Sequence, residues 1–181
     1  MDLDSLLASF DGEPGYLDWA AFGPLSPSVR SEVHADAELL GSGRRSSIEL
    51  IGEHVLEARE LLAELLGGEV DQVALQPSTT YGLTQAIYGL AGGVMLSRAE
   101  FPSLTVTATR AADALGSIDL QWLEPSDGFV TPEVVRDALT DDTRAIAVSL
   151  VDFRTGYRAD LTALREVIGD RLLIVDAMQG F

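Results

Sequence analysis

The residues best suited to chemistry follow apolar, strand-like runs. The segment Gln76–Gly82 follows one such run and contains Ser78, Thr79 and Thr80 at an expected strand-to-helix turn. Hydroxyls and free backbone N–H groups at the start of a helix can bind a phosphate, and the helix dipole adds positive partial charge. Serine and threonine also serve commonly as plain helix N-caps, so both interpretations stay open. The Gly-Lys-Ser/Thr of a P-loop is absent here.

Two further positions of this kind lie later in the chain. Phe101 follows the run Val94–Ser97, and its ring could stack on a planar ligand or belong to the core. Asp176 directly follows Leu172–Val175, which places a carboxylate at a buried strand end. Such a carboxylate is costly unless it pairs with a cation or a strong donor. A protonated ring nitrogen of a ligand would serve, and a metal ion or a helix N-cap role are the alternatives.

Together the three positions describe a ligand with a phosphate, a flat ring and a basic ring nitrogen. Pyridoxal phosphate has all three features, whereas a flavin or a dinucleotide matches fewer. The two histidines, His34 and His54, lie on expected helices without partners at metal-ligand spacing. We therefore expect them to be surface or packing residues, and we predict no metal site.

An α/β framework is expected to position these residues, because strand-like and helical runs alternate after Gly68. The strands are short and nearly all apolar, as in a mostly parallel sheet with helices on both faces, and ligands bind outside the carboxyl ends of such strands. Strands are expected at Gln72–Leu75, Val94–Ser97, Leu120–Leu123, Ala145–Val151 and Leu172–Val175. Helices are expected at Thr80–Leu90, Leu104–Leu115, Pro132–Leu139 and Leu161–Ile168.

Before Gly68 the pattern is helical. Short and medium helices are expected over Asp2–Phe10 and from Pro27 to Leu40, after the N-cap Ser26. A longer amphipathic helix is expected over Ser47–Leu66, ended by a glycine. Its apolar face consists of Ile48, Ile51, Val55, Leu62 and Leu65.

Composition limits the possible functions. The chain of 181 residues has 12 basic and 29 acidic residues, a formal net charge of −17, which argues against binding nucleic acid or an anionic membrane through a basic surface. Cysteine is absent, which excludes disulfides and thiolate sites within the chain. All 12 basic residues are arginine, so no lysine of this chain can form a Schiff base. No apolar run is long enough to span a membrane, and the start Met1–Asp4 lacks a basic secretory region, so we expect a cytoplasmic protein.

The order of several short motifs resembles the class V aminotransferase family, which belongs to the fold-type I enzymes that depend on pyridoxal phosphate. The family includes cysteine desulfurases, selenocysteine lyases, kynureninases and an epimerase. The motifs are Tyr16–Leu25, Ser78–Leu83, Glu100–Ser103, Phe153–Leu161 and Val175–Phe181. Each is weak alone, and their order and spacing together carry the match.

The resemblance implies a role for each candidate residue. Thr79 and Thr80 match the phosphate-binding pair, and Phe101 matches the residue that stacks on the cofactor ring, commonly histidine in the desulfurases. Asp176 matches the partner of the pyridine nitrogen, and Gln179 matches the residue that hydrogen-bonds the phenolic oxygen of the ring. The segment Tyr16–Leu25 matches a stretch near the substrate.

The resemblance also implies that residues 1–40 are an N-terminal segment and that 41–181 begin the large, cofactor-binding domain. The catalytic lysine, the rest of that domain and the small domain are expected beyond Phe181, so this chain alone is predicted to be inactive. The whole enzyme is expected to be a homodimer acting on an amino acid or related amine by transamination, desulfuration or β-elimination. The alternative is a truncated, non-catalytic paralogue that binds a phosphorylated ligand or a partner protein. A nucleotide-binding α/β domain is disfavoured because no glycine-rich turn is present.

Overall fold

A computed structural model describes residues 2–180. The chain divides into two compact units, Met1–Leu75 and Gln76–Phe181, called here the N-terminal and C-terminal units. All the candidate cofactor residues belong to the C-terminal unit. The expected domain division at residues 40 and 41 concerns the whole protein, and it stays a prediction.

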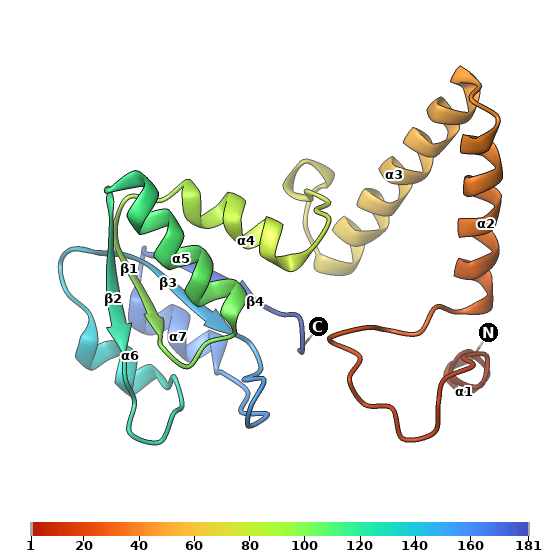
Figure 1. The fold of residues 1–181 in the computed structure, drawn as a ribbon. Helices are drawn as coiled ribbons and strands as arrows, with labels where there is room; N and C mark the ends of the chain where they lie inside the picture. The colour runs from red at the N-terminus through yellow and green to blue at the C-terminus, as the bar shows by residue number, and fades with distance from the viewer. Residues whose placement is uncertain (1, 181) are drawn as a thin grey trace. The chain divides into compact units, whose positions relative to one another are not determined.

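The C-terminal unit is built on a four-stranded, all-parallel sheet in the order β2-β1-β3-β4 (Figure 1). The strands are β1 (Gly92–Ser97), β2 (Ile118–Leu123), β3 (Thr143–Ser149) and β4 (Leu172–Asp176). Ser149 and Asp176, the last residues of β3 and β4, are paired in register. The carboxyl ends of these two strands therefore lie side by side.

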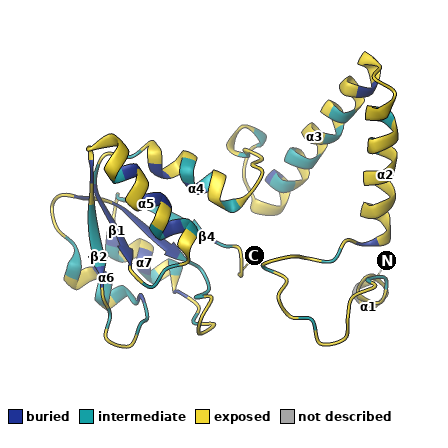
Figure 2. Ribbon diagram, viewed as in Figure 1, coloured by how far each residue is buried: buried dark blue, intermediate teal, exposed yellow. Residues whose placement is uncertain are grey.

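Helices cover both faces of this sheet, as the sequence predicts. The helices are α4 (Thr79–Tyr88) and α5 (Pro102–Leu115) on one face, and α6 (Pro132–Ala138) and α7 (Leu161–Ile168) on the other. Side chains alternate between the faces of a strand. Val94 and Leu96 accordingly pack with α4 and α5, whereas Met95 packs with α6 and α7. Figure 2 shows the resulting buried layer along β1 and β3.

The expected strand at Gln72–Leu75 is wrong. Val70–Gln72 forms a 3-10 turn, and Val73 is extended but joins none of the four strands. The guanidinium of Arg59 instead donates to the carbonyls of Val70 and Val73, at 2.7 and 2.9 Å. A strand needs a neighbouring strand to accept and donate its backbone hydrogen bonds, and an arginine side chain takes that place here.

The expected strand Ala145–Val151 is shorter at its end than predicted. β3 ends at Ser149, and Val151 makes only an isolated antiparallel bridge with Arg158. The chain turns between these two bridge residues, because Asp152 accepts hydrogen bonds from the backbone N–H groups of Arg154 and Thr155. The segment after β3 is therefore a tight loop.

The N-terminal unit is helical, with α1 (Leu3–Ala8), α2 (Pro27–Gly41) and α3 (Arg45–Leu66). Ser26 caps α2 with Pro27 in its first turn, and Gly67 ends α3 in the left-handed conformation at φ 67°. The expected apolar face of α3 is largely uncovered, since Ile48 is 63% and Leu65 is 67% exposed. None of the described helices is both long enough and apolar enough to cross a membrane.

Candidate functional site

The first turn of α4 presents two threonine hydroxyls to other segments. Ser78 is the N-cap of this helix, because its hydroxyl accepts from the N–H of Tyr81 at 3.4 Å. Thr79 Oγ1 donates to Met178 Sδ at 3.4 Å, and Thr80 Oγ1 lies 2.8 Å from Ser103 Oγ. The capping role thus belongs to Ser78. The hydroxyls of Thr79 and Thr80 are not used for capping, and they contact the turn after β4 and the start of α5.

Asp176 ends β4 and is only 6% exposed. Its Oδ1 accepts one hydrogen bond, from the N–H of Met178 at 3.0 Å. Within residues 2–180 no arginine or histidine forms an ion pair with it. Residues 177–180, which follow it, form a turn. A buried carboxylate with one neutral donor fits a positively charged ligand group, because such a partner offsets the loss of solvation.

Phe101 lies in the loop between β1 and α5 and is 43% exposed, so it is not a core residue. Its ring packs edge-on against Phe153, with centroids 5.1 Å apart and an interplanar angle of 89°. Phe153 belongs to the tight loop after β3. An exposed aromatic pair at the strand ends offers an apolar surface for a planar ligand.

Gln179 is exposed in the turn that follows β4. A Cβ added to the next residue, Gly180, would lie 2.7 Å from Leu150 Cδ2, so this backbone packs tightly against the loop after β3. The N–H of Gly180 also donates to the carbonyl of Ala177 at 3.0 Å. The turn that carries Gln179 is therefore held in place beside Asp176.

Glu100 is a half-buried acidic residue that the sequence analysis did not single out. Its Oε2 accepts from the N–H and the hydroxyl of Ser149, at 3.1 and 2.6 Å. Burial raises the pKa of Glu100, the bonds from Ser149 oppose that rise, and the nearby charges of Asp152 and Asp176 add to it. The available signal was weaker than for Asp176, because Glu100 lies three residues after the apolar strand β1, whereas Asp176 directly follows its apolar run.

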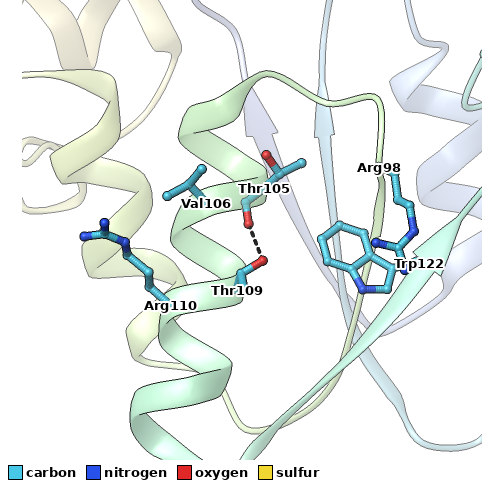
Figure 3. Close-up of a pocket in the computed structure, with 6 residues that line it drawn as sticks. All are labelled: Arg98, Thr105, Val106, Thr109, Arg110 and Trp122. Carbon is cyan, nitrogen blue, oxygen red and sulfur yellow. Dashed lines mark hydrogen bonds between the residues drawn. The ribbon is translucent and has the colours of Figure 1, made fainter.

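A separate recess lies on the β2 side of this unit. It has a volume of about 370 Å³ and is lined by Arg98, Thr105, Val106, Thr109, Arg110 and Trp122 (Figure 3). The Arg98 guanidinium lies 4.5 Å from the centroid of the Trp122 ring and is paired with Glu124 at 2.7 Å. None of the candidate residues lines this recess, and its Arg98 is already partnered.

His54 has neighbours that the sequence analysis missed. Its Nδ1 lies 3.3 Å from Asp36 Oδ1 and 3.9 Å from Glu32 Oε1, so residues of α2 and α3 meet. Among the described residues, the side chains of Glu32, Asp36 and His54 lie close enough together to share a metal ion. Glu32 is 65% exposed at its side chain, and we interpret the group as a contact between the two helices.

Comparisons with known proteins found a matching family and several relatives. The family model for aminotransferase class V matches residues 16–181. A cysteine desulfurase IscS of Ectopseudomonas mendocina is 30% identical over 185 residues, covering 92% of this chain and 45% of that protein. A probable cysteine desulfurase of Aeropyrum pernix is 33% identical over 136 residues, covering 68% of this chain and 32% of that protein. The chain thus spans less than half of the length of each of these two relatives.

Solved structures share the fold. A C-DES mutant with glycine covalently linked to its PLP cofactor has a TM-score of 0.84 at 18% identity, covering 96% of this chain and 49% of that one. DndA from Streptomyces lividans has a TM-score of 0.74 at 24% identity, covering 92% of this chain and 50% of that one. At these identities the likeness concerns the fold, and the family rests on the match over residues 16–181. On that match, the chain belongs to the class V aminotransferase family.

Proposed function

We propose that the whole protein is a pyridoxal-phosphate-dependent enzyme acting on an amino acid or a related amine, and that this chain supplies part of its cofactor site. The observation that carries the proposal is Asp176, a buried carboxylate at a strand end that has one neutral donor and no cation among the described residues. A protonated pyridine ring would supply the missing positive charge.

Different residues of this chain would bind different parts of the cofactor. Thr79 and Thr80, with the N-terminal end of α4, would bind the phosphate through hydroxyls and free N–H groups. Asp176 would accept a hydrogen bond from the ring nitrogen and favour its protonated form. Phe101 would cover one face of the ring, and Gln179 would donate to its phenolic oxygen. When bound, pyridoxal phosphate supplies a ring that withdraws electrons from the substrate's α-carbon.

The amine that anchors the cofactor must come from elsewhere in the whole protein, because all 12 basic residues here are arginine. The matched relatives named cysteine desulfurase favour cysteine as the substrate and cleavage of its C–S bond. Phe101 cannot transfer a proton, so any proton transfer on its face of the ring requires another group. Transamination and β-elimination remain the other reactions proposed.

We also propose a homodimer. The uncovered apolar side chains on α3, with Ile48 at 63% and Leu65 at 67% exposed, support an association that buries them. A cytoplasmic location is proposed with this assignment.

The alternative function is that of a non-catalytic paralogue that binds a phosphorylated ligand, and the absence of lysine favours it. One experiment separates the two: adding pyridoxal phosphate to the whole protein, recording the absorbance, reducing with borohydride and mapping the modified peptide by mass spectrometry. We expect an adduct on a lysine outside residues 1–181. A protein that gives neither an absorbance change nor an adduct would overturn the enzyme proposal in favour of the paralogue.

A further inference from the structure

Glu100 connects the ends of three neighbouring strands. It lies three residues after Ser97, the end of β1, and its Oε2 binds the N–H and hydroxyl of Ser149 at the end of β3. Ser149 is in turn the register partner of Asp176 at the end of β4. The N–H of Leu150 also donates to the carbonyl of Asp176 at 2.8 Å. Glu100 therefore holds the segment against which Asp176 is aligned.

Negative charges outnumber positive charges around Glu100. Asp152 and Asp176 are close enough for their charges to raise the pKa of Glu100, in addition to the larger effect of burial. The nearby cation is Arg154, and its Nη2 lies 2.7 Å from Asp152 Oδ2, so it is committed to that residue. Among the described residues neither Glu100 nor Asp176 forms an ion pair, although the charge of Glu100 adds to the rise in the pKa of Arg154 that is caused mainly by Asp152.

An arrangement of this kind is costly to the fold without its ligand. A carboxyl group whose pKa is raised on folding gives stability that is full at low pH and is lost as the pH rises through the raised pKa. Glu100 therefore opposes folding when it is ionised. A group that reduces stability at a binding site is expected where it serves the ligand.

We propose that Glu100 is a positioning residue of the cofactor site: it fixes the end of β3 beside Asp176 through Ser149, and its negative charge reinforces that of Asp176 toward the cationic ring. The inference rests on the proposed function, because it supposes that the cationic partner of Asp176 is the cofactor. It gives Glu100 an effect on the cofactor without direct contact.

The first test uses Glu100→Gln in the whole protein. Glutamine keeps an oxygen that can accept from Ser149 and removes the charge. At a pH where Glu100 is ionised, we expect the cofactor-free variant to melt at a higher temperature than the wild type, because a repulsive, half-buried charge is gone. We expect its affinity for pyridoxal phosphate, measured by titration, to fall roughly tenfold, the size of a one-unit change in the pKa of the ring nitrogen. Opposite changes in melting temperature and affinity are the signature of the proposal.

The matched control is Glu124→Gln, because the Glu124 side chain is 70% exposed and also lies just after a strand. It removes the same charge at the surface, and neither quantity should change appreciably. If Glu100→Gln lowers melting temperature and affinity together, Glu100 is merely structural and the proposal is wrong. If Glu100→Gln leaves affinity unchanged, the proposal is also wrong.

A second variant, Ser149→Ala, guards against a failure of Glu100→Gln to fold. It keeps the backbone N–H and the charge of Glu100 and removes one donor, so the pKa of Glu100 should rise further. We expect cofactor binding to weaken as the pH falls and to recover as the pH rises and Glu100 ionises. An equal loss at every pH would contradict the role of the charge.

Failure of the proposed function looks different. Asp176→Asn should weaken cofactor binding more than Glu100→Gln does, because Asp176 would contact the ring. If Asp176→Asn binds pyridoxal phosphate as tightly as the wild type, the cofactor role of Asp176 fails, and this inference fails with it. If only Asp176→Asn weakens binding, the function stands and the role of Glu100 is rejected.

Discussion

The two units of this chain differ in how much they bury. The C-terminal unit encloses two apolar clusters, one on each face of its sheet, with Leu96 and Ile146 wholly inaccessible to solvent. In the described part of the N-terminal unit, only one apolar side chain, that of Ala63, is buried. Helix α2 contains no buried residue. One unit is stabilised by its own core, and the other exposes the apolar faces of its helices.

The candidate chemistry belongs to the unit with the core. Asp176, Glu100 and Ser149 occupy strand ends or the residues just after them, so their backbone positions are fixed by parallel ladders and packed helices. A buried carboxylate requires such rigidity, because a flexible segment would simply return it to water. The N-terminal unit, with little core, is better suited to association.

The largest expected effect tests the core directly. Ile146→Ala should destabilise the fold by about 2–5 kcal/mol, because the side chain is fully buried at the centre of the sheet. Ile48→Ala on α3 is the control, and it should cost no more than about 0.5 kcal/mol at a protein concentration where the chain is monomeric. Denaturant unfolding measures both. Equal costs would remove the distinction between the two units.

The second prediction tests what the exposed faces do. Ile48→Asp places a charge in the uncovered row of α3 and should convert the proposed homodimer into a monomer, because a buried unpaired charge is costly. Light scattering of the whole protein measures the mass. Val106→Asp is the control, since Val106 is an exposed residue of α5 outside that row. A wild-type monomer, or a variant that stays dimeric, would contradict an association through α3.

The third prediction compares helix starts. Asp160 caps α7 by accepting from the N–H of Ala163 at 3.0 Å, so Asp160→Ala should cost about 0.5–2 kcal/mol. Arg44 occupies the N-cap position of α3 without a side-chain capping bond, and Arg44→Ala should cost much less. Thermal melts of the two variants decide the matter. If the two variants lost similar amounts of stability, side-chain capping would not be a difference between the helices of the two units.

The smallest effect concerns the loop after β3. Burial alone would raise the pKa of Asp152, but hydrogen bonds from Arg154 and Thr155 lower it overall. Its stability contribution is therefore present above the ordinary aspartate pKa and is lost as the pH falls through the lowered folded value. Asp152→Asn should flatten the acid limb of the stability curve slightly. An unchanged acid limb would show that this loop contributes nothing measurable.

Much of the fold could be predicted because local chemistry determines it. Ser26 and Pro27 start α2, Gly67 ends α3, and apolar runs give β1 and β4 at nearly their observed positions. Strand pairing is not a local property. The run Gln72–Leu75 has the composition of a strand, but a strand forms only where a neighbouring strand pairs with its backbone. Here the Arg59 side chain donates hydrogen bonds to the carbonyls of Val70 and Val73 instead.

A site residue could be predicted where the neighbouring sequence alone indicates its position in the fold. Asp176 follows an apolar run, and its burial is confirmed. The roles of Thr79, Thr80, Phe101, Asp176 and Gln179 toward a cofactor stay predictions. The bond from Glu100 to Ser149 spans 49 residues of sequence, and the contact of His54 with Asp36 joins two helices. No spacing rule reports such contacts, because they arise only when the elements pack.

The central claim is that Asp176 serves a cationic cofactor, and Asp176→Ala in the whole protein tests it most directly. Melting temperature and turnover with saturating pyridoxal phosphate are measured together. Our account predicts a loss of turnover of about a hundredfold or more, about 2.7 kcal/mol of transition-state stabilisation, because a neutral ring accepts electrons less well. The melting temperature should change little, because the carboxylate accepts one hydrogen bond from the protein. A sharply lowered melting temperature with near-normal turnover would contradict the claim.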